Sequence, residues 1–276
     1  MPHFVKRIWP QSALRIMRLG YQLGTRWLAG SLPNRCLLCH QSISLPETGI
    51  CAVCLQSGLY HGPICLGCGK SMQIEVDYCG ECQKRQPRKV IAPCSYHQGL
   101  GAWVGAIKYQ GQLAALPVLC SALVARIKVL EQQGLISLPQ AIVPVPLHPK
   151  RLQQRGFNQA WLIAHELSQL LQLPLVSEGL TRQQDTRPQA GLSGAQRRRN
   201  LHDAFMLADD FAFQRVALVD DVVTTGTTVS EIARLFEARY VHVQVWCLAR
   251  AEAPGLLDNI APLYLCVCQN YVKNTA

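Results

Sequence analysis

Eight of the 13 cysteines stand in CxxC pairs, and these pairs carry the most evident chemistry in the sequence. They are Cys36/Cys39, Cys51/Cys54, Cys65/Cys68 and Cys79/Cys82. Two residues between cysteines form a tight turn that aims both thiolates at one metal ion, and two such turns complete a tetrahedral zinc site. The spacing therefore predicts two sequential zinc ribbons, each binding one zinc ion through four cysteines.

The spacing alone leaves alternatives open. The four turns also allow an interleaved pairing, and a CxxC pair can serve redox chemistry. Redox pairs are typical of a strand–helix–strand context, which the cysteine-rich segment 36–86 lacks. We expect both zinc ions to be structural, because a segment this short cannot build a core of its own. Direct contact of the ribbons with a ligand is the alternative.

The other cysteines and the N-terminal segment bear on the cellular compartment. The five remaining cysteines are scattered, and Cys120 and Cys247 stand in apolar runs, where a thiol behaves as a small hydrophobe. Residues 1–35 carry six basic residues (Lys and Arg) and no acidic one, but no uninterrupted apolar stretch typical of an export signal. Thiols kept reduced favour a cytoplasmic protein. The segment 1–35 is interpreted as a flexible leader; a basic amphipathic helix touching nucleic acid or the inner membrane is the alternative.

A second concentration of chemistry lies in the segment from Arg215 to Thr228. An apolar run ends in Asp220 and Asp221, and a turn of small hydroxyl residues around Gly226 follows. A glycine lets backbone N–H groups close around a phosphate, and the helix expected from Thr227 aims its N-terminal donors at the same anion. Paired carboxylates would repel a bare phosphate, so they suit a ligand that also offers hydroxyl groups or a bridging cation, such as a ribose 5-phosphate.

Basic residues are placed where they could bind a polyanion. Lys150 and Arg151 follow the end of an expected strand and could neutralise a diphosphate. The segment 179–201 is polar and basic, and we expect a long loop there that closes over a diphosphate or grips a single-stranded nucleic acid. Its candidate nucleic-acid residues are Arg182, Arg187, Arg197, Arg198 and Arg199.

Composition narrows the classes of function. With 27 Lys and Arg against 17 Asp and Glu, the net charge of +10 favours polyanionic partners such as nucleic acid or phosphates. Hydrophobic residues at 49% and charged residues at 16% exclude a disordered chain. The longest charge-free apolar stretch, 113–125, is too short to span a bilayer and contains a proline, so no transmembrane segment is expected.

From residue 92 onward, strand and helix patterns alternate. We expect strands at 95–100, 141–147, 216–219 and 241–249, and helices at 102–108, 113–130, 158–171 and 227–238, with a loop at 148–156. This alternation predicts a mostly parallel α/β sheet flanked by helices. Four segments are expected: a basic leader (1–35), a double zinc ribbon (36–86), an α/β domain (92–250) and a C-terminal appendage (251–276) with a strand at 264–267.

The run from Arg215 to Thr228 resembles the phosphoribosyl pyrophosphate signature of type I phosphoribosyltransferases. That resemblance implies that Asp220 and Asp221 contact the ribose hydroxyls. It implies a 5-phosphate site made of Thr224, Thr225, Gly226, Thr227 and Thr228, and a pyrophosphate loop at Lys150 and Arg151. With the zinc ribbons, the run 142–151, Arg155-Gly156-Phe157-Asn158-Gln159 and the motif residues between 181 and 200, residues 36–250 resemble the ComF/GntX family of competence and DNA-utilisation proteins.

The resemblance implies a binding function and leaves an enzymatic one open. On the first reading, the protein binds phosphoribosyl pyrophosphate with Mg²⁺ and holds single-stranded DNA through its ribbons and basic loops, together with other DNA-import or DNA-processing proteins. On the second, it transfers a phosphoribosyl group to a nitrogenous acceptor, displacing pyrophosphate. The surplus positive charge favours the first reading, and the acidic motif suits both. No base-binding hood is recognisable in the sequence.

Overall fold

The structure is a computed structural model, which describes residues 34–44, 47–85, 87–110, 113–183 and 204–252. The chain divides into two compact units, one numbered 1–52 and the other 53–276. The second cysteine group lies in the larger unit, with the α/β sheet. The four segments predicted from the sequence remain a prediction, since most of 1–35 and 251–276 lies outside the described residues.

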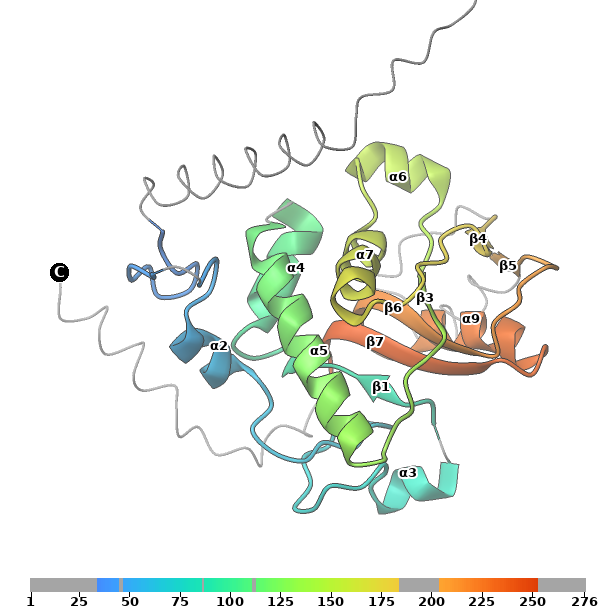
Figure 1. Ribbon diagram of the computed structural model, residues 1–276, viewed down its shortest axis with the longest axis horizontal. Coiled ribbons are helices and arrows are strands. Elements are labelled where there is room, and N and C mark those ends of the chain that lie inside the picture. Colours follow the sequence, from blue (N-terminus) through green and yellow to red (C-terminus); the bar gives the residue numbers. More distant parts are fainter. Residues whose placement is uncertain (1–33, 45–46, 86, 111–112, 184–203, 253–276) are drawn as a thin grey trace, which may run out of the picture. The chain divides into compact units, whose positions relative to one another are not determined.

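A five-stranded parallel sheet forms the centre of the larger unit (Figure 1). Its strands are β1 (Val90–Ile91), β2 (Cys94–Ser95), β3 (Ala141–Pro144), β6 (Arg215–Val223) and β7 (His242–Arg250). They run in the order β1-β7-β6-β3, and β2 also pairs with β7. All these pairs are parallel. The strands are apolar runs because both faces of the sheet are covered.

The described helices are α2 (Ala52–Gly58), α3 (Gly80–Arg85), α4 (Gly101–Gln110), α5 (Leu116–Gln132), α6 (Pro149–Arg155), α7 (Gln159–Leu171) and α9 (Thr227–Glu237). Of these, α4, α5, α7 and α9 make the main contacts with the strands of the sheet (Figure 1). A 3₁₀ turn, Leu113–Ala115, leads into α5. Strands β4 (Leu180–Arg182) and β5 (Phe205–Leu207) form a separate antiparallel pair.

The core lies on both sides of the sheet. Because side chains alternate along a strand, Val216 and Leu218 of β6 pack in one cluster with Ile232 and Phe236 of α9. The intervening β6 residues face the other side, where α4, α5 and α7 contact the sheet (Figure 1). The amphipathic pattern of α9 follows from this packing, with its buried residues at Val229, Ile232, Ala233 and Phe236. The doubly wound α/β fold expected from the sequence is confirmed.

Helix α5 is longer than the charge-free stretch suggested. Together with the 3₁₀ turn it forms a 20-residue apolar helix, Leu113–Gln132, which by length and composition alone could cross a membrane. Its residues Leu119, Leu123, Ile127 and Leu130 are fully buried, however, and the helix packs on α7 and β7. Its apolar side is therefore the side that builds the core, so a membrane span is not needed to explain it.

The segment 148–156, expected to be a loop, contains α6 instead. The His148 Nδ1 atom accepts a hydrogen bond from the Lys150 N–H at 3.3 Å, Pro149 occupies the first turn, and Gly156 ends the helix with φ 78°. A proline at the start and a left-handed glycine at the end are ordinary helix boundary signals. They were outweighed by the lack of apolar periodicity, because α6 has no buried residue.

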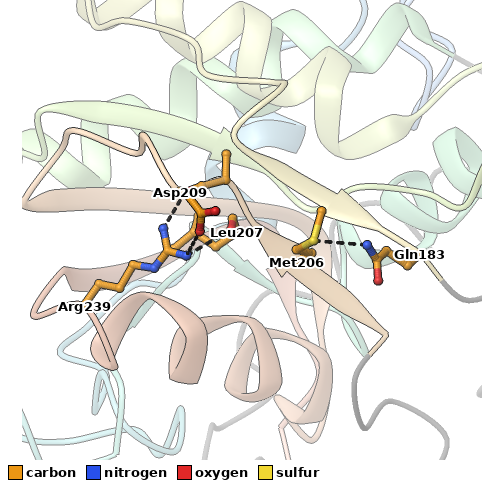
Figure 2. A network of polar contacts seen from close by, with 6 residues as sticks. Gln183, Met206, Leu207, Asp209 and Arg239 are labelled. Atoms are coloured by element: carbon orange, nitrogen blue, oxygen red, sulfur yellow. Dashed lines mark hydrogen bonds and ion pairs between the residues drawn. The ribbon is translucent and has the colours of Figure 1, made fainter.

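The β4–β5 pair is anchored to the C-terminal end of α9 (Figure 2). The Arg239 guanidinium donates to the Leu207 carbonyl at 3.2 Å and pairs with the Asp209 carboxylate at 3.0 Å. On the other edge of the pair, the Gln183 amide lies 3.1 Å from the Met206 sulfur. The β4–β5 pair therefore packs beside α9, on the same face of the sheet.

Candidate functional site

The eight paired cysteines gather into two groups in sequential order. One group holds Cys36, Cys39, Cys51 and Cys54, and the other holds Cys65, Cys68, Cys79 and Cys82. Within each group all four sulfur atoms lie within 4.8 Å of one another. The interleaved pairing that the spacing left open is not the one adopted.

The sulfur positions fit a tetrahedral metal ion. Zinc–sulfur bonds of about 2.3 Å place neighbouring sulfurs about 3.8 Å apart in a tetrahedron. The Cys39 and Cys51 sulfurs are 3.9 Å apart, and those of Cys68 and Cys79 are 3.6 Å apart. A disulfide would bring them to about 2.05 Å. The four-thiolate set and this spacing both suit Zn²⁺.

The two groups are built as structural repeats. In each, the chain pairs with itself across the first CxxC, at Arg35 with Ser42 and at Ile64 with Ser71. The Cys36 carbonyl accepts from the His40 N–H and the Cys65 carbonyl from the Gly69 N–H, both at 2.9 Å. The residue that closes each turn has positive φ, 59° in the first ribbon and 82° in the second.

Backbone donors point at the sulfurs of the first cysteine of each group. The Cys51 N–H donates to the Cys36 sulfur at 3.3 Å and the Cys79 N–H to the Cys65 sulfur at 3.2 Å. Burial raises the pKa of the Cys36 thiol, but hydrogen bonds from backbone N–H groups outweigh burial and lower that pKa to about 7. In the second group burial likewise raises the pKa of the Cys79 thiol, but the same kind of backbone hydrogen bond lowers that pKa to about 7. Cys36 and Cys79 thus favour the thiolate form, which is the form that binds metal.

The phosphate-binding turn predicted from the sequence follows β6 directly. Gly226 has φ 70° and precedes α9 as its N-cap without a capping side chain. The first N–H groups of this 11-residue helix therefore face the turn with the positive end of the helix dipole. The Thr225 and Thr227 hydroxyls lie 2.8 Å apart across the same turn. The arrangement is that of an anion site made by backbone and hydroxyl donors.

The two carboxylates lie near the C-terminal end of β6, where only Val222 and Val223 follow them in the strand. Asp221 is 5% exposed and Asp220 is partly exposed. The Asp220 Oδ1 atom accepts from the Asp221 N–H at 2.9 Å, and the Asp221 Oδ1 atom accepts from the Val222 N–H at 2.8 Å. These contacts fix both side chains next to the turn, since each carboxylate is tied to the backbone one residue on.

Lys150 and Arg151 reach the same edge of the sheet through β3. Strand β3 runs parallel to β6, and the Val145 N–H extends the pairing by donating to the Val219 carbonyl at 2.8 Å. Parallel neighbours end at one edge, so the segment that carries α6 leaves the sheet beside the one that carries Asp220. Lys150 is exposed on α6 and Arg151 partly so.

Of the five candidate nucleic-acid arginines, the structure describes Arg182 alone. Arg182 lies on β4 rather than in a loop, is 9% exposed, and its guanidinium carbon lies 5.3 Å from the centre of the Phe205 ring. Through this cation–π contact Arg182 takes part in the packing of β4 against β5. Arg187, Arg197, Arg198 and Arg199 lie outside the described residues.

Three cysteines outside the groups are core residues. Cys94, Cys120 and Cys247 are fully buried. Burial raises the pKa of all three thiols, and that of Cys94 reaches about 12 with a further contribution from the Glu252 charge. The prediction of small hydrophobes at Cys120 and Cys247 is confirmed. Trp161 stands at an apolar position of the α7 sequence pattern, which predicts a core residue, but it is 38% exposed and stacks on His165, with ring centres 5.1 Å apart.

A buried polar cluster escapes prediction from the sequence. Arg250, the last residue of β7, and Glu252, two residues further on, are 7% and 4% exposed. The Arg250 guanidinium donates to the Leu66 carbonyl at 3.1 Å and to the Gly67 carbonyl. The Glu252 carboxylate accepts from the Ser95 hydroxyl at 2.8 Å and from the Tyr60 hydroxyl. Gly67 and Gly69, in and next to the first CxxC turn of the second group, leave room for this close approach.

A shallow hollow of about 350 Å³ lies away from the edge of the sheet that carries the phosphate-binding turn. It is lined by residues of β5 and by Leu235, Ala238 and Arg239 at the C-terminal end of α9. The phosphate-binding turn is at the N-terminal end of the same helix. Because the Arg239 contacts of Figure 2 cross this hollow, it belongs to the anchoring of the β4–β5 pair.

Known proteins share both parts of this architecture. A family model for a double zinc ribbon domain matches residues 27–83, and one for a phosphoribosyl transferase domain matches residues 158–270. Among solved structures, adenine phosphoribosyltransferase from Saccharomyces cerevisiae is 18% identical with a TM-score of 0.30, over 49% of this chain and 69% of that one.

The fold and the site thus define an α/β protein of the phosphoribosyltransferase type that carries a double zinc ribbon. Two relatives match nearly their whole length. Competence protein F of Haemophilus influenzae is 37% identical over 223 residues, 79% of this chain and 97% of that protein. DNA utilization protein YhgH of Escherichia coli K12 is 34% identical, over 80% of this chain and 98% of that protein. The chain belongs to the ComF/GntX family of competence and DNA-utilisation proteins, as its sequence motifs predicted.

Proposed function

We propose that this protein works in the uptake or use of DNA, binding phosphoribosyl pyrophosphate at the end of β6 and single-stranded DNA on its basic surfaces. The observation that carries the proposal is the strand–turn–helix in which Asp220 and Asp221, near the end of β6, precede a short turn that leads through Gly226 into the N-terminus of α9. The names of the two relatives place such a chain in competence or DNA utilisation.

The chemistry of the turn supports a sugar phosphate over inorganic phosphate. Backbone N–H groups and the hydroxyls of Thr225 and Thr227 suit a 5-phosphate. The carboxylates of Asp220 and Asp221 suit the ribose hydroxyl donors. Lys150 and Arg151, arriving at the same edge from β3, suit the diphosphate. Mg²⁺ would enter with the diphosphate and neutralise part of its charge.

Zinc is proposed as a structural ion in both ribbons, with two ions per chain. The support is the sulfur spacing and the donor set of four cysteines in each group. Two groups of four cysteines arranged for a metal ion, rather than paired in disulfides, favour a reducing, cytoplasmic location.

Isothermal titration calorimetry with phosphoribosyl pyrophosphate and Mg²⁺ tests the ligand site. We expect binding to the wild type and at least about tenfold weaker binding to Asp220→Ala/Asp221→Ala, since each lost hydrogen bond to a charged group contributes about 1.5–3 kcal/mol. Asp210→Ala, an exposed aspartate near the other end of α9, is the matched control and keeps wild-type affinity. Absence of heat with the wild-type protein would refute the ligand site.

Single-stranded DNA binding is supported by the surface at the junction of α6 and α7. Helix α6 presents Lys150, Arg151 and Arg155 without an acidic residue. Six residues beyond Arg155, in the first turn of α7, the exposed Trp161 ring stacks on His165. Basic groups next to an exposed aromatic face suit a phosphate backbone and its unpaired bases.

Oligothymidine binding at two salt concentrations tests this surface. We expect affinity to fall steeply with salt, and Lys150→Ala/Arg155→Ala to reduce the salt dependence by about two released ions. Lys128→Ala, an exposed lysine of α5, serves as the charge control. Affinity independent of salt would contradict an electrostatic interface.

The second candidate function is phosphoribosyl transfer. In that reaction a nitrogen of the acceptor forms a bond to the anomeric carbon as the carbon–oxygen bond to pyrophosphate breaks, and the acceptor proton passes to solvent. The intact acidic pair and turn favour it, because they are the groups that hold the sugar in place. Pyrophosphate released from phosphoribosyl pyrophosphate when one of a panel of nucleobases is added as acceptor, in an Asp220-dependent manner, would establish transfer. Its absence with proven ligand binding would leave the binding function alone.

A further inference from the structure

One side chain holds the second zinc ribbon against the end of the sheet. The Arg250 guanidinium donates to the carbonyls of Leu66 and Gly67, the two residues between Cys65 and Cys68. The Leu66 carbonyl also accepts a second hydrogen bond, from the Val90 N–H of β1 at 2.9 Å. The CxxC turn is therefore fixed to both β7 and β1.

The charge of Arg250 suits this position. A zinc ion with four thiolates carries a net charge of −2, and a guanidinium bound to the intervening carbonyls offsets part of that charge. The neighbouring Glu252 carboxylate is held by the hydroxyls of Ser95 and Tyr60. Burying a cation without a compensating group is costly, so the 7% exposure of Arg250 is consistent with a compensating anion at the ribbon.

The second ribbon is shaped for this contact. At Gly67 an added Cβ atom would lie 2.6 Å from Cγ of Pro87 and 2.9 Å from the Cys82 sulfur. At Gly69, with φ 82°, it would lie 2.9 Å from Cδ of Arg250. The equivalent positions of the first ribbon carry Leu38 and His40, so its turn does not have this glycine pair. The two ribbons are therefore not interchangeable.

The backbone of the same arginine borders the phosphate-binding turn. Arg250 is the register partner of Val223, the last residue of β6, and the Ala251 N–H donates to the Val223 carbonyl at 2.9 Å. Thr224, the first residue of the turn, comes next in the chain. One residue thus contacts the zinc ribbon by its side chain and the strand that carries the turn by its backbone.

We propose that Arg250 couples the second zinc site to the phosphate-binding turn, so that a bound sugar phosphate slows zinc loss from that site and leaves the first site unaffected. The inference rests on the proposed function, because it needs a ligand at the turn. Coupling between two sites is reciprocal, so zinc in the second site also raises the affinity for the ligand.

Zinc release to the chromogenic chelator 4-(2-pyridylazo)resorcinol measures the coupling in the full chain. Two double variants separate the sites: Cys36→Ser/Cys39→Ser retains the second site, and Cys65→Ser/Cys68→Ser retains the first. We expect phosphoribosyl pyrophosphate with Mg²⁺ to slow release about fivefold or more from the second site, the lower end of typical coupling, and to leave release from the first unchanged.

Variants at Arg250 show whether this residue carries the effect. Arg250→Met keeps an unbranched apolar stem without the charge and the donors of the guanidinium, and it should release the second zinc faster and lose the ligand protection. Arg250→Lys, which keeps the charge and one donor, should restore part of that protection. Cobalt substituted for zinc gives thiolate charge-transfer bands, and these should shift in Arg250→Met for the second site alone.

The outcomes separate this inference from the proposed function. Calorimetric binding of phosphoribosyl pyrophosphate with unchanged zinc release overturns the coupling and leaves the function in place. Equal protection of both sites, or protection that survives in Arg250→Met, also overturns the role of Arg250. No calorimetric binding at all overturns the function and the coupling together.

Discussion

The Asn158 side chain joins α7 to the end of β3. Its amide donates to the Val145 carbonyl at 3.1 Å, while its Oδ1 atom accepts from the Ala160 N–H at 3.0 Å as the helix cap. Asn158 belongs to the Arg155–Gln159 motif, so part of that motif has a structural purpose: it fixes the geometry of the segment carrying Lys150 and Arg151.

We expect Asn158→Ala to lower the free energy of unfolding by about 1–2 kcal/mol, because it removes a helix cap and leaves the Val145 carbonyl without its donor. Asn158→Asp keeps the cap and loses only the donor, so its cost should be smaller. Urea denaturation followed by circular dichroism measures both. Equal stability of Asn158→Ala and wild type would contradict the assigned role.

Gly226 should matter for the ligand more than for stability. With φ 70°, a side chain there costs about 1 kcal/mol, although the added Cβ atom would meet only Cγ2 of Val229 at 3.7 Å. Gly134 after α5 has φ 71° and no atom within 4 Å of an added Cβ, which makes Gly134→Ala a matched control. Both variants should lose similar stability in urea, and Gly226→Ala alone should weaken phosphoribosyl pyrophosphate binding in calorimetry.

The raised pKa of the Cys94 thiol predicts that the protein loses stability at alkaline pH. Burial, followed by the charge of Glu252, raises the pKa of its thiol from 9.0 to about 12. The unfolded thiol loses its proton above 9, whereas the folded thiol keeps it. Its contribution to stability is therefore complete below pH 9 and is lost as pH rises toward 12.

Replacing Cys94 by alanine tests this sign. Wild type should lose stability faster than Cys94→Ala between about pH 8 and pH 10.5, by up to about 1.4 kcal/mol per pH unit for one proton. Comparing the two slopes removes the constant cost of the deleted sulfur, including its 3.2 Å contact with the Leu248 carbonyl. Parallel pH profiles for the two proteins would contradict the raised pKa.

Arg182 separates packing from DNA binding. Since its guanidinium lies over Phe205 and the side chain is 9% exposed, Arg182→Met should cost about 0.5–2 kcal/mol of stability. Oligothymidine affinity and its salt dependence should stay at wild-type values, in contrast to Lys150→Ala/Arg155→Ala. A drop in salt dependence for Arg182→Met would return this residue to the nucleic-acid interface.

Local patterns predicted the parts of the fold that local interactions determine. The apolar spacing of α9 and the glycine at position 226 can each be recognised within a few residues of sequence, and the structure has them where the sequence placed them. Helix α6 was missed because it buries no residue, so no periodicity marks it. Strand β4 was missed because its partner β5 follows more than 20 residues later.

No local sequence pattern predicts the contacts that join the second zinc ribbon to the sheet. Arg250 and Leu66 are 184 residues apart, and Glu252 and Tyr60 are 192 apart. A single sequence carries no information on such pairs beyond the residue types themselves. The CxxC spacing, in contrast, predicted the cysteine groups well because each turn is local, and only the pairing of the turns required the structure.

The two zinc sites should differ in what their removal does to the protein. The second group lies in the larger unit, where Leu66 is bonded to Val90 and Arg250 and where Arg126 of α5 pairs with Glu75 at 3.0 Å. We expect Cys65→Ser/Cys68→Ser to lower the thermal midpoint of the α/β domain by several degrees, at about 2–4 °C per kcal/mol, since the ribbon loses the shape that makes these contacts. Cys36→Ser/Cys39→Ser should leave that transition near its wild-type temperature.

Differential scanning calorimetry with elemental analysis measures both, with two zinc ions expected in wild type and one in each variant. A wild-type chain with fewer than two zinc ions, or equal destabilisation by the two variants, would show that the ribbons do not have these separate roles.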